Sequence, residues 1–364
     1  ETALKFAKES TEMNKNVLIV EGGPGTGKSV VAINLLTELT KRGNVTQYVT
    51  KNSAPSEVYQ VKLSGKFTKT RISNLFSSSG SFYDIESNTF DSIIVDEAHR
   101  LNAKSGLFSH LGENQIKELI NASKLSIFFI DEDQRVTLKD IGKKSEIIRW
   151  AEILGAKVTL MELASQFRCN GSDGYIAWLD NLLQIKETAN ETLEGMNYDF
   201  EVIDNPSTLH QKIIDLNRDN NKSRLLAGYC WKWISKNNPE VKDIVIGDYR
   251  ATWNLNSQGQ SWIVHPNSVT EVGCIHTAQG LELDHVGVII GPDMVVRNGQ
   301  IITDSTKRAT SDQSVKGIKN QLKEKPEETK KLADMIIKNT YRTLMTRGMK
   351  GCYIYSVDLE TQDY

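Results

Sequence analysis

Short apolar runs, each closed by polar residues, recur through the first half of the chain and alternate with segments of helical periodicity. A strand buried on both faces of a parallel sheet produces such a continuous run. The apolar runs are Val17–Val20, Phe90–Val95 and Ser126–Ile130, and Val45–Thr50 and Val158–Leu163 are further predicted strands. Their alternation with helices predicts an α/β fold, in which helices cover both faces of a mostly parallel sheet. The Ser-rich stretch 64–88 has no clear period and is interpreted as a loop with at most one helix.

A second series of strands and helices follows from residue 166 onward. The predicted strands are Tyr198–Ile203, Arg224–Tyr229, Val286–Ile290 and Tyr353–Tyr355, and the predicted helices are Ser207–Leu216 and Lys331–Arg347. A chain of 364 residues is long enough for two domains, each with its own core. We therefore expect a first domain over residues 1–165 and a second over residues 166–364.

Residues 292–330 interrupt the second series. The dipeptide Asn298-Gly299 predicts a hairpin over Val295–Ile302. The stretch 306–331 mixes lysines and arginines with acids, and such mixing favours a solvated, partly mobile segment. The alternative is an insertion that contacts nucleic acid. The same choice arises for four tryptophans, for which core packing is favoured over stacking on bases: Trp231, Trp233, Trp253 and Trp262.

Composition excludes several classes of protein. The 44 basic and 46 acidic side chains give a formal charge of -2, which neither supports nor excludes a nucleic-acid partner, because only a local basic face is needed. The four cysteines are scattered without C-x-x-C spacing, which favours a reduced interior over disulfides or a zinc site. No apolar stretch approaches membrane-spanning length and no signal peptide is visible. We expect a cytoplasmic protein, and we interpret the start at Glu1, without Met, as part of a longer chain.

One segment between the first strand and the first long helix matches G-x-x-x-x-G-K-[ST], the phosphate-binding loop. Its glycines allow successive backbone N–H groups to converge on a phosphate, and the helix N-terminus adds a positive dipole end. The predicted ATP-binding residues are Gly22, Gly23, Pro24, Gly25, Thr26, Gly27, Lys28 and Ser29. Lys28 would reach the β- and γ-phosphates, and the Ser29 hydroxyl would bind Mg²⁺. A glycine-rich loop that binds nothing is the disfavoured alternative, since both flanks fit.

Two adjacent carboxylates close the apolar run that ends at Val95. Asp96 can hold Mg²⁺ through water, and Glu97 can accept a proton from, or orient, the water that attacks the γ-phosphate. The alternative is an acidic pair that stabilises a helix N-terminus. It is less favoured beside a phosphate-binding loop. Gln134 follows the next strand and would lie at the carboxyl end of the sheet, where α/β proteins bind ligands.

Together these segments resemble the motor core of superfamily 1 helicases. The phosphate loop is similar to motif I and Asp96–His99 to motif II. Asp131–Gln134 resembles motif III, with a spacing that departs from Gly-Asp-x-x-Gln. Gln166-Phe167-Arg168 resembles motif IV, which implies that Arg168 contacts the γ-phosphate. Thr50 is similar in position to residues that touch the nucleic-acid backbone.

The second half carries two further resemblances. The stretch Cys274–Glu282 is similar to motif V, T-x-H-x-x-Q-G-x-E. This implies that Gly280 and Glu282 lie at the nucleotide, and that His276 and Thr277 face nucleic acid. Tyr341–Arg347 resembles motif VI, which implies that Arg347 is an arginine finger supplied by the second domain.

The order of the motifs is most like the bacterial Schlafen-type DNA/RNA helicase domain. This resemblance implies two RecA-like domains, ATP as substrate, Mg²⁺ as cofactor and single-stranded DNA or RNA as partner, in a bacterial monomer. It also leaves room for an N-terminal nuclease or other domain outside this chain. The expected activity is ATP hydrolysis coupled to movement on, or remodelling of, nucleic acid. A nucleotide-dependent switch that binds without unwinding is the alternative, and a small-molecule kinase is a remote one. The expected catalytic residues are Lys28, Asp96, Glu97, Gln134, Arg168 and Arg347.

Overall fold

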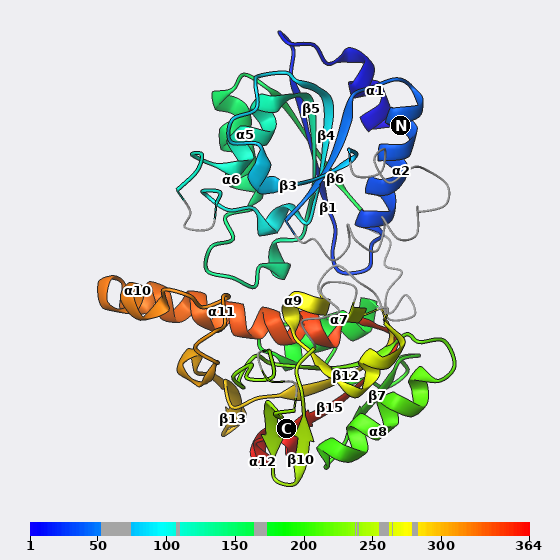
Figure 1. The fold of residues 1–364 in the computed structure, drawn as a ribbon, viewed down its shortest axis with the longest axis vertical. Helices are drawn as coiled ribbons and strands as arrows, with labels where there is room; N and C mark the ends of the chain where they lie inside the picture. Colours follow the sequence, from blue (N-terminus) through cyan, green and yellow to red (C-terminus); the bar gives the residue numbers. More distant parts are fainter. Residues whose placement is uncertain are drawn as a thin grey trace. The chain divides into compact units, whose positions relative to one another are not determined.

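The first half of the chain folds around one parallel sheet, seen in a computed structural model (Figure 1). The structure describes residues 1–51, 74–106, 110–163, 173–236, 238, 240–254, 262–263, 265–278 and 283–364. The chain divides into one unit of Glu1–Arg135 with Lys139–Gln166, and a second of Val136–Leu138 with Phe167–Tyr364. The predicted boundary puts Val136–Leu138 in the first domain, and the local sequence pattern of these residues does not indicate that they belong to the second unit.

In the first unit the strand order is β3-β2-β4-β5-β1-β6, and all neighbouring strands are parallel. The strands are β1 (Asn16–Glu21), β2 (Thr46–Thr50), β3 (Phe76–Ser78), β4 (Phe90–Asp96), β5 (Ser123–Ile130) and β6 (Lys157–Glu162). The helices are α1 (Thr2–Glu9), α2 (Lys28–Lys41), α5 (Gln115–Ala122) and α6 (Lys144–Ile153). Strand β3 corrects the interpretation of stretch 64–88 as loop and helix. Residues 52–73 lie outside the described part.

Alternate side chains of β1 enter different cores, which explains its continuous apolar run. Val17 and Ile19 pack on the face covered by α5 and α6. Leu18 and Val20 pack on the face covered by α1 and α2. Figure 1 shows these two pairs of helices on opposite sides of the sheet. Burial on both faces is the physical cause of the pattern from which the sheet was predicted.

The second unit contains a five-stranded parallel sheet of order β11-β8-β12-β15-β7. Its strands are β7 (Asp199–Val202), β8 (Ser223–Ala227), β11 (Val272–Gly273), β12 (Leu283–Ile290) and β15 (Gly348–Ser356). Its helices are α7 (Asp173–Leu182), α8 (Pro206–Asn217), α9 (Ile275–Ala278), α10 (Ile318–Glu324), α11 (Pro326–Met345) and α12 (Leu359–Asp363). Helix α8 lies on one face of this sheet and α11 on the other (Figure 1). The prediction of a mostly parallel sheet with helices on both faces is confirmed for both units.

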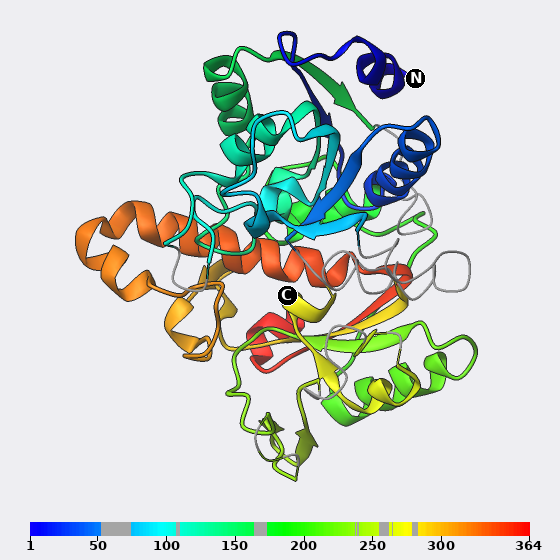
Figure 2. The same ribbon diagram turned by 45° about the horizontal axis from the view of Figure 1, so that its top comes forward.

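Two antiparallel hairpins accompany the second sheet: β9 (Ile244–Ile246) with β10 (Tyr249–Ala251), and β13 (Met294–Arg297) with β14 (Gln300–Thr303). The second hairpin turns at Asn298 and Gly299, which both have positive φ, as the Asn-Gly dipeptide predicted. Figure 2 shows α10 folded back beside α11. Among the described residues, no helix combines the length and apolarity needed to cross a membrane.

The charged stretch after this hairpin is not a uniformly solvated segment. The Arg308 side chain is fully buried, as are Asp312 and Ser314. This corrects the favoured interpretation of the insertion, because charge mixing in a sequence does not show which charges find partners inside. The packing interpretation is confirmed for Trp253 and Trp262, which are fully buried, while Trp231 and Trp233 are partly buried and pack against the core that contains Trp253.

Candidate nucleotide-binding site

The phosphate-binding loop lies between β1 and α2, where the sequence predicted it. Gly25 and Gly27 have φ of 79° and 80°, a left-handed conformation that is strained for any residue with a Cβ. Gly27 is also the N-cap of α2, and its carbonyl accepts the first hydrogen bond of the helix from Val31 N. The glycines therefore wind the backbone directly into a helix N-terminus, which is the arrangement that binds phosphate.

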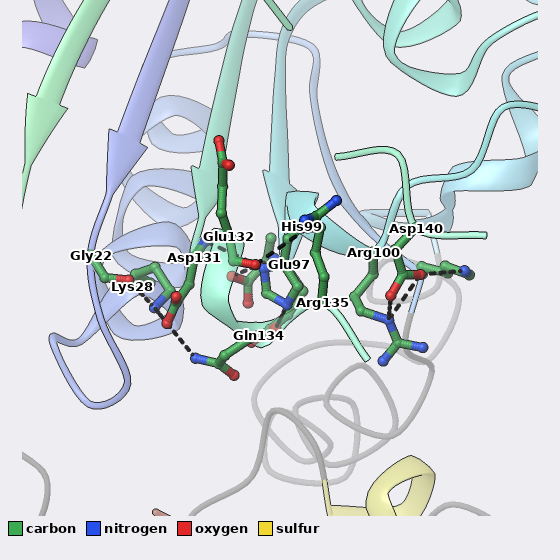
Figure 3. A network of polar contacts seen from close by, with 12 residues as sticks. Gly22, Lys28, Glu97, His99, Arg100, Asp131, Glu132, Gln134, Arg135 and Asp140 are labelled. Atoms are coloured by element: carbon green, nitrogen blue, oxygen red, sulfur yellow. Dashed lines mark hydrogen bonds and ion pairs between the residues drawn. The ribbon is translucent and has the colours of Figure 1, made fainter. Parts of the chain in front are cut away.

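Lys28 is buried at the first position of α2, and its ammonium group is turned into the loop. Nζ donates to the carbonyl oxygens of Gly22 at 2.6 Å and Gly23 at 2.8 Å. It also lies 3.6 Å from Asp131 Oδ2. Figure 3 shows Asp131 between Lys28 and Gln134. The lysine is thus held by backbone oxygens and one carboxylate, and a bound phosphate would have to replace part of this set.

Asp96 ends β4 and is 1% exposed. Its carboxylate accepts hydrogen bonds from Tyr48 Oη at 2.6 Å, from Glu97 N at 3.0 Å and from the Ser29 hydroxyl. Burial raises the pKa of Asp96 above its ordinary value, and the neighbouring Glu97 carboxylate raises it further. A buried carboxylate paired with a serine hydroxyl is an oxygen donor set of the kind that Mg²⁺ prefers. The two predicted metal residues, Ser29 and Asp96, therefore fit the ion.

Glu97 is positioned by an unusual backbone and by His99. Its φ of 54° is left-handed, and the 3₁₀ turn Ala98–Arg100 follows it. The His99 Nδ1 accepts the Asp131 N–H at 3.4 Å, so the ring proton is assigned to Nε2. That Nε2 lies 2.9 Å from Glu97 Oε2. The fully buried imidazole thus ties the end of β4 to the end of β5 (Figure 3).

Gln134 closes the 3₁₀ turn Glu132–Gln134 after β5 and is 3% exposed. Its Nε2 donates to Asp131 Oδ2 at 2.6 Å, on the same oxygen that faces Lys28. The structure therefore brings five predicted residues to one edge of the first sheet: Lys28, Ser29, Asp96, Glu97 and Gln134.

Sequence reasoning missed three residues that hold this group together. Tyr48 holds Asp96, His99 holds Glu97, and Asp131 links Lys28 to Gln134. A signal was present for Asp131, because it follows β5 directly as Asp96 ends the neighbouring parallel strand β4. Tyr48 carries no such signal, since its contact with Asp96 joins separate strands. His99 lies only two residues after Glu97, but its second contact, with Asp131 N, joins the ends of two separate strands.

A second polar group lies after β2 and contains more cations than carboxylates. Lys51 Nζ donates to Asn102 Oδ1 at 2.7 Å and lies 3.4 Å from Asp140 Oδ1. Arg100 Nε lies 3.3 Å from Asp140 Oδ2. Burial lowers the pKa of Lys51 to about 8, although Asp140 opposes the shift. Thr50, predicted to touch nucleic acid, precedes Lys51 and pairs with Asp96 in the β2–β4 register.

The predicted residues of the second unit are described by themselves. Thr277 Oγ1 accepts from Cys274 N and donates to Cys274 O, both at 2.9 Å, so it stabilises the turn that begins α9. His276 Nε2 lies 3.7 Å from Asp312 Oδ1. Arg347 is 1% exposed, and its Nε donates to Thr343 O at 3.1 Å. The predictions for Arg168, Gly280 and Glu282 fall outside the described residues.

Comparison with known proteins gives one related chain and several distant structures. The chain is 22% identical over 414 residues to the uncharacterized protein YPL245W of Saccharomyces cerevisiae, covering 100% of this chain and 88% of that protein. This relative is from a yeast and does not support the bacterial source expected from the sequence.

A Pif1 helicase structure, from work on DNA unwinding at forked double-stranded DNA, is 12% identical with a TM-score of 0.39, covering 100% of this chain and 92% of the other. AMPPCP-bound DnaA from Aquifex aeolicus is 14% identical with a TM-score of 0.26, covering 60% of each chain. These scores are too low to carry an inference about function.

The family comparison is far more extensive. The model of the Schlafen group 3 DNA/RNA helicase domain matches residues 15–358, from the residue before β1 to the residue before α12. The match includes the phosphate loop, the Asp96–His99 segment, and α11 with Arg347 after it. The resemblance inferred from the motifs is confirmed, and the chain belongs to the Schlafen group 3 DNA/RNA helicase domain family.

Proposed function

We propose that this chain hydrolyses ATP with Mg²⁺ and couples hydrolysis to movement on, or remodelling of, single-stranded DNA or RNA. The observation that carries the proposal is the set of contacts that joins Lys28 to Asp131 and Gln134, next to the Ser29–Asp96–Glu97 group. Each side chain of this set has a defined use in phosphoryl transfer. Membership of a helicase-domain family supports the nucleic-acid part of the proposal.

The residues of the first unit have separate tasks in this mechanism. Lys28 exchanges the carbonyl oxygens of Gly22 and Gly23 for phosphate oxygens, which neutralises charge on the nucleotide. Ser29 and Asp96 hold Mg²⁺, which when bound neutralises phosphate charge. Glu97 orients the attacking water and accepts its proton, while His99 fixes the carboxylate of Glu97.

Gln134 is assigned to sensing the γ-phosphate region, since its amide is already aligned by Asp131, which also faces Lys28. Movement of Lys28 toward phosphate changes the charge that faces Asp131 and, through it, the orientation of Gln134. The motif resemblance assigns γ-phosphate contacts to Arg168 and Arg347, and nucleotide contacts to Gly280 and Glu282. These four roles are proposals that rest on the motifs.

Nucleic acid is the proposed partner of Thr50, His276 and Thr277, with Lys51 as an added cation. A lysine with a pKa of about 8 carries its charge through most of the neutral range and binds phosphate as a point charge. Because DNA and RNA both carry phosphate, a phosphate contact does not distinguish them, and stimulation by each must be measured separately.

The test is ATPase activity with and without single-stranded DNA or RNA, in the wild type, Lys28→Ala and Arg347→Ala. Lys5→Ala serves as the control, because Lys5 is an exposed residue of α1. We expect stimulation of the wild type and the control, and no hydrolysis by Lys28→Ala. Loss of an arginine finger should lower kcat of Arg347→Ala by roughly 10³-fold or more.

A melting curve shows whether Arg347→Ala is still folded. Binding of a fluorescent ATP analogue then shows whether the variant has lost hydrolysis alone, because the phosphate loop belongs to the other unit. Full stimulated activity of Arg347→Ala would contradict the arginine-finger role. Absence of stimulation of the wild type by either polymer would contradict the motor. ATP-dependent binding of nucleic acid without displacement of an annealed strand or a bound protein would support the switch instead.

A further inference from the structure

A cluster of buried charges lies in the second unit, within the insertion that the nucleotide site does not use. The side chains of Asp293, Arg308 and Asp312 are all 0% exposed. Arg308 Nη1 lies 3.3 Å from Asp293 Oδ2, and Arg308 Nε donates to Asp312 Oδ2. Burial alone would raise the pKa of Asp312, but His276, Arg308 and Ser314 outweigh burial and hold this pKa below its ordinary value.

The two carboxylates of this cluster reach two helices that carry helicase motifs. Asp293 Oδ1 accepts the hydroxyl hydrogen of Tyr341, on α11, the helix that precedes Arg347. Asp312 Oδ1 lies 3.7 Å from His276 Nε2, on α9. It also accepts from Ser314 N at 2.9 Å and Ser314 Oγ at 2.7 Å. The cluster therefore contacts both the motif V segment and the motif VI helix.

The same segment also anchors the chain that leaves the Gln134 turn. Val136–Leu138 belongs to the second unit, although it begins only two residues after Gln134. Leu138 N donates to Ser314 O at 2.9 Å, and Leu138 packs against Val315 and Ile318. Val136 is fully buried in the core that also contains Ile275 of α9. Ser314 is thus bonded to this anchor through its carbonyl oxygen and to Asp312 through its hydroxyl and N–H.

We propose that Asp312 and Ser314 are positioning residues that make ATP hydrolysis responsive to nucleic acid. Asp312 faces His276 at 3.7 Å, and Ser314, which Asp312 binds, is bonded to the anchor Val136–Leu138 of the chain that carries Gln134. This inference rests on the proposed function, because it assigns nucleic acid to His276 and the γ-phosphate region to Gln134. Stability alone does not account for the charges, since a buried ion cluster contributes little more than well-packed apolar residues of similar volume.

In the proposed mechanism, a change in the position of His276 is transmitted to the anchor Val136–Leu138. A shift of His276 on binding nucleic acid changes its contact with Asp312 Oδ1, the oxygen that also accepts both Ser314 bonds. Ser314 and the Leu138 anchor then move together, because a backbone hydrogen bond joins them and Leu138 packs against Val315, the residue after Ser314. Coupling between sites of this kind is a difference in free energy and works in both directions.

The test compares Asp312→Asn and Ser314→Ala with Asp304→Asn. Asp304→Asn removes the same charge from the same insertion. Asparagine can replace Asp304 as the cap that accepts from Thr306 N. For each variant we would measure basal ATPase, maximal stimulation by a single-stranded oligonucleotide, the concentration that gives half-maximal stimulation, and the KM for ATP. We expect both positioning variants to keep basal rate and ATP KM and to lose stimulation by about fivefold or more. The control should match the wild type.

Each outcome decides the inference. If Asp312→Asn is unfolded, as judged by its melting curve, Ser314→Ala decides alone, because it removes one hydroxyl and keeps the charge. Stimulation within about twofold of the wild type in the folded variants would overturn the inference. A parallel loss of basal and stimulated rate would show a merely structural role and would also overturn it. If the wild type itself is not stimulated, the proposed function fails, and the inference fails with it.

Discussion

Replacing His99 should slow hydrolysis without weakening ATP binding. The buried imidazole touches Glu97 Oε2 at 2.9 Å and accepts the Asp131 N–H at 3.4 Å, while no described contact joins it to the phosphate loop. His99→Leu removes both contacts with a side chain of similar size to histidine. His99→Gln keeps a carbonyl that can accept and an amide that can donate, so it is the conservative variant.

The magnitude follows from the contact that is lost. The His99 Nε2 and Glu97 Oε2 atoms are 2.9 Å apart but lack the alignment of a hydrogen bond, so about 1.5–3 kcal/mol, the contribution of a hydrogen bond to a charged group, is an upper limit for the contact. If this contact serves to hold Glu97 for the transition state, kcat falls by up to roughly 10- to 100-fold, since about 1.4 kcal/mol corresponds to tenfold. The ATP KM should stay near its wild-type value. The unpaired Asp131 N–H should also lower the free energy of unfolding, by about 1–3 kcal/mol.

The assay is steady-state ATP hydrolysis at saturating single-stranded nucleic acid, with a melting curve for each variant. Adding Glu97→Gln gives a double-mutant cycle. Because His99 acts through Glu97, the double variant His99→Leu/Glu97→Gln should be no slower than Glu97→Gln alone, and His99→Gln should recover part of kcat. Multiplicative losses, or a His99→Leu enzyme with unchanged kcat, would refute the assignment of His99 to the positioning of Glu97.

Two further predictions concern buried charges of the first unit. The raised pKa of Asp96 means that the folded state binds more protons than the unfolded state above the ordinary value of 3.8, so stability falls as pH rises through this window. Asp96→Asn should remove this fall in stability and abolish Mg²⁺-dependent hydrolysis. It should also raise the melting temperature by roughly 2–4 °C per kcal/mol of relieved desolvation. A melting temperature below that of the wild type would contradict the prediction. The pKa of Lys51 is lowered to about 8 from 10.5, so the unfolded state binds more protons in that window and stability rises with pH. Lys51→Met should flatten this rise in urea unfolding measured across the window, whereas an unchanged slope would show that Lys51 is not its source.

Several features of the fold were predictable because they depend on local rules. Strand β1 was visible as a continuous apolar run, and the hairpin β13–β14 was visible from Asn298-Gly299. Strand β3 was missed because its three residues are too short to show a period, and it forms only by pairing with β2. The buried state of Arg308 was also hidden, since its partner Asp293 is fifteen residues away.

The sequence by itself determined the phosphate loop, the carboxylates after β4 and the alternation that builds a parallel sheet. These features follow from backbone conformation and burial, which act over a few neighbouring residues. Only the tertiary structure decided that Asp131 joins Lys28 to Gln134, and that His99 holds Glu97. It also decided that Val136–Leu138 belongs with Ser314 in the second unit. The contacts of Lys28 with Asp131 and of Leu138 with Ser314 join residues far apart in the chain. The contacts of Glu97 with His99 and of Asp131 with Gln134 are local, but the side-chain orientations that make them are set by packing, and neither kind of contact leaves a period in the sequence.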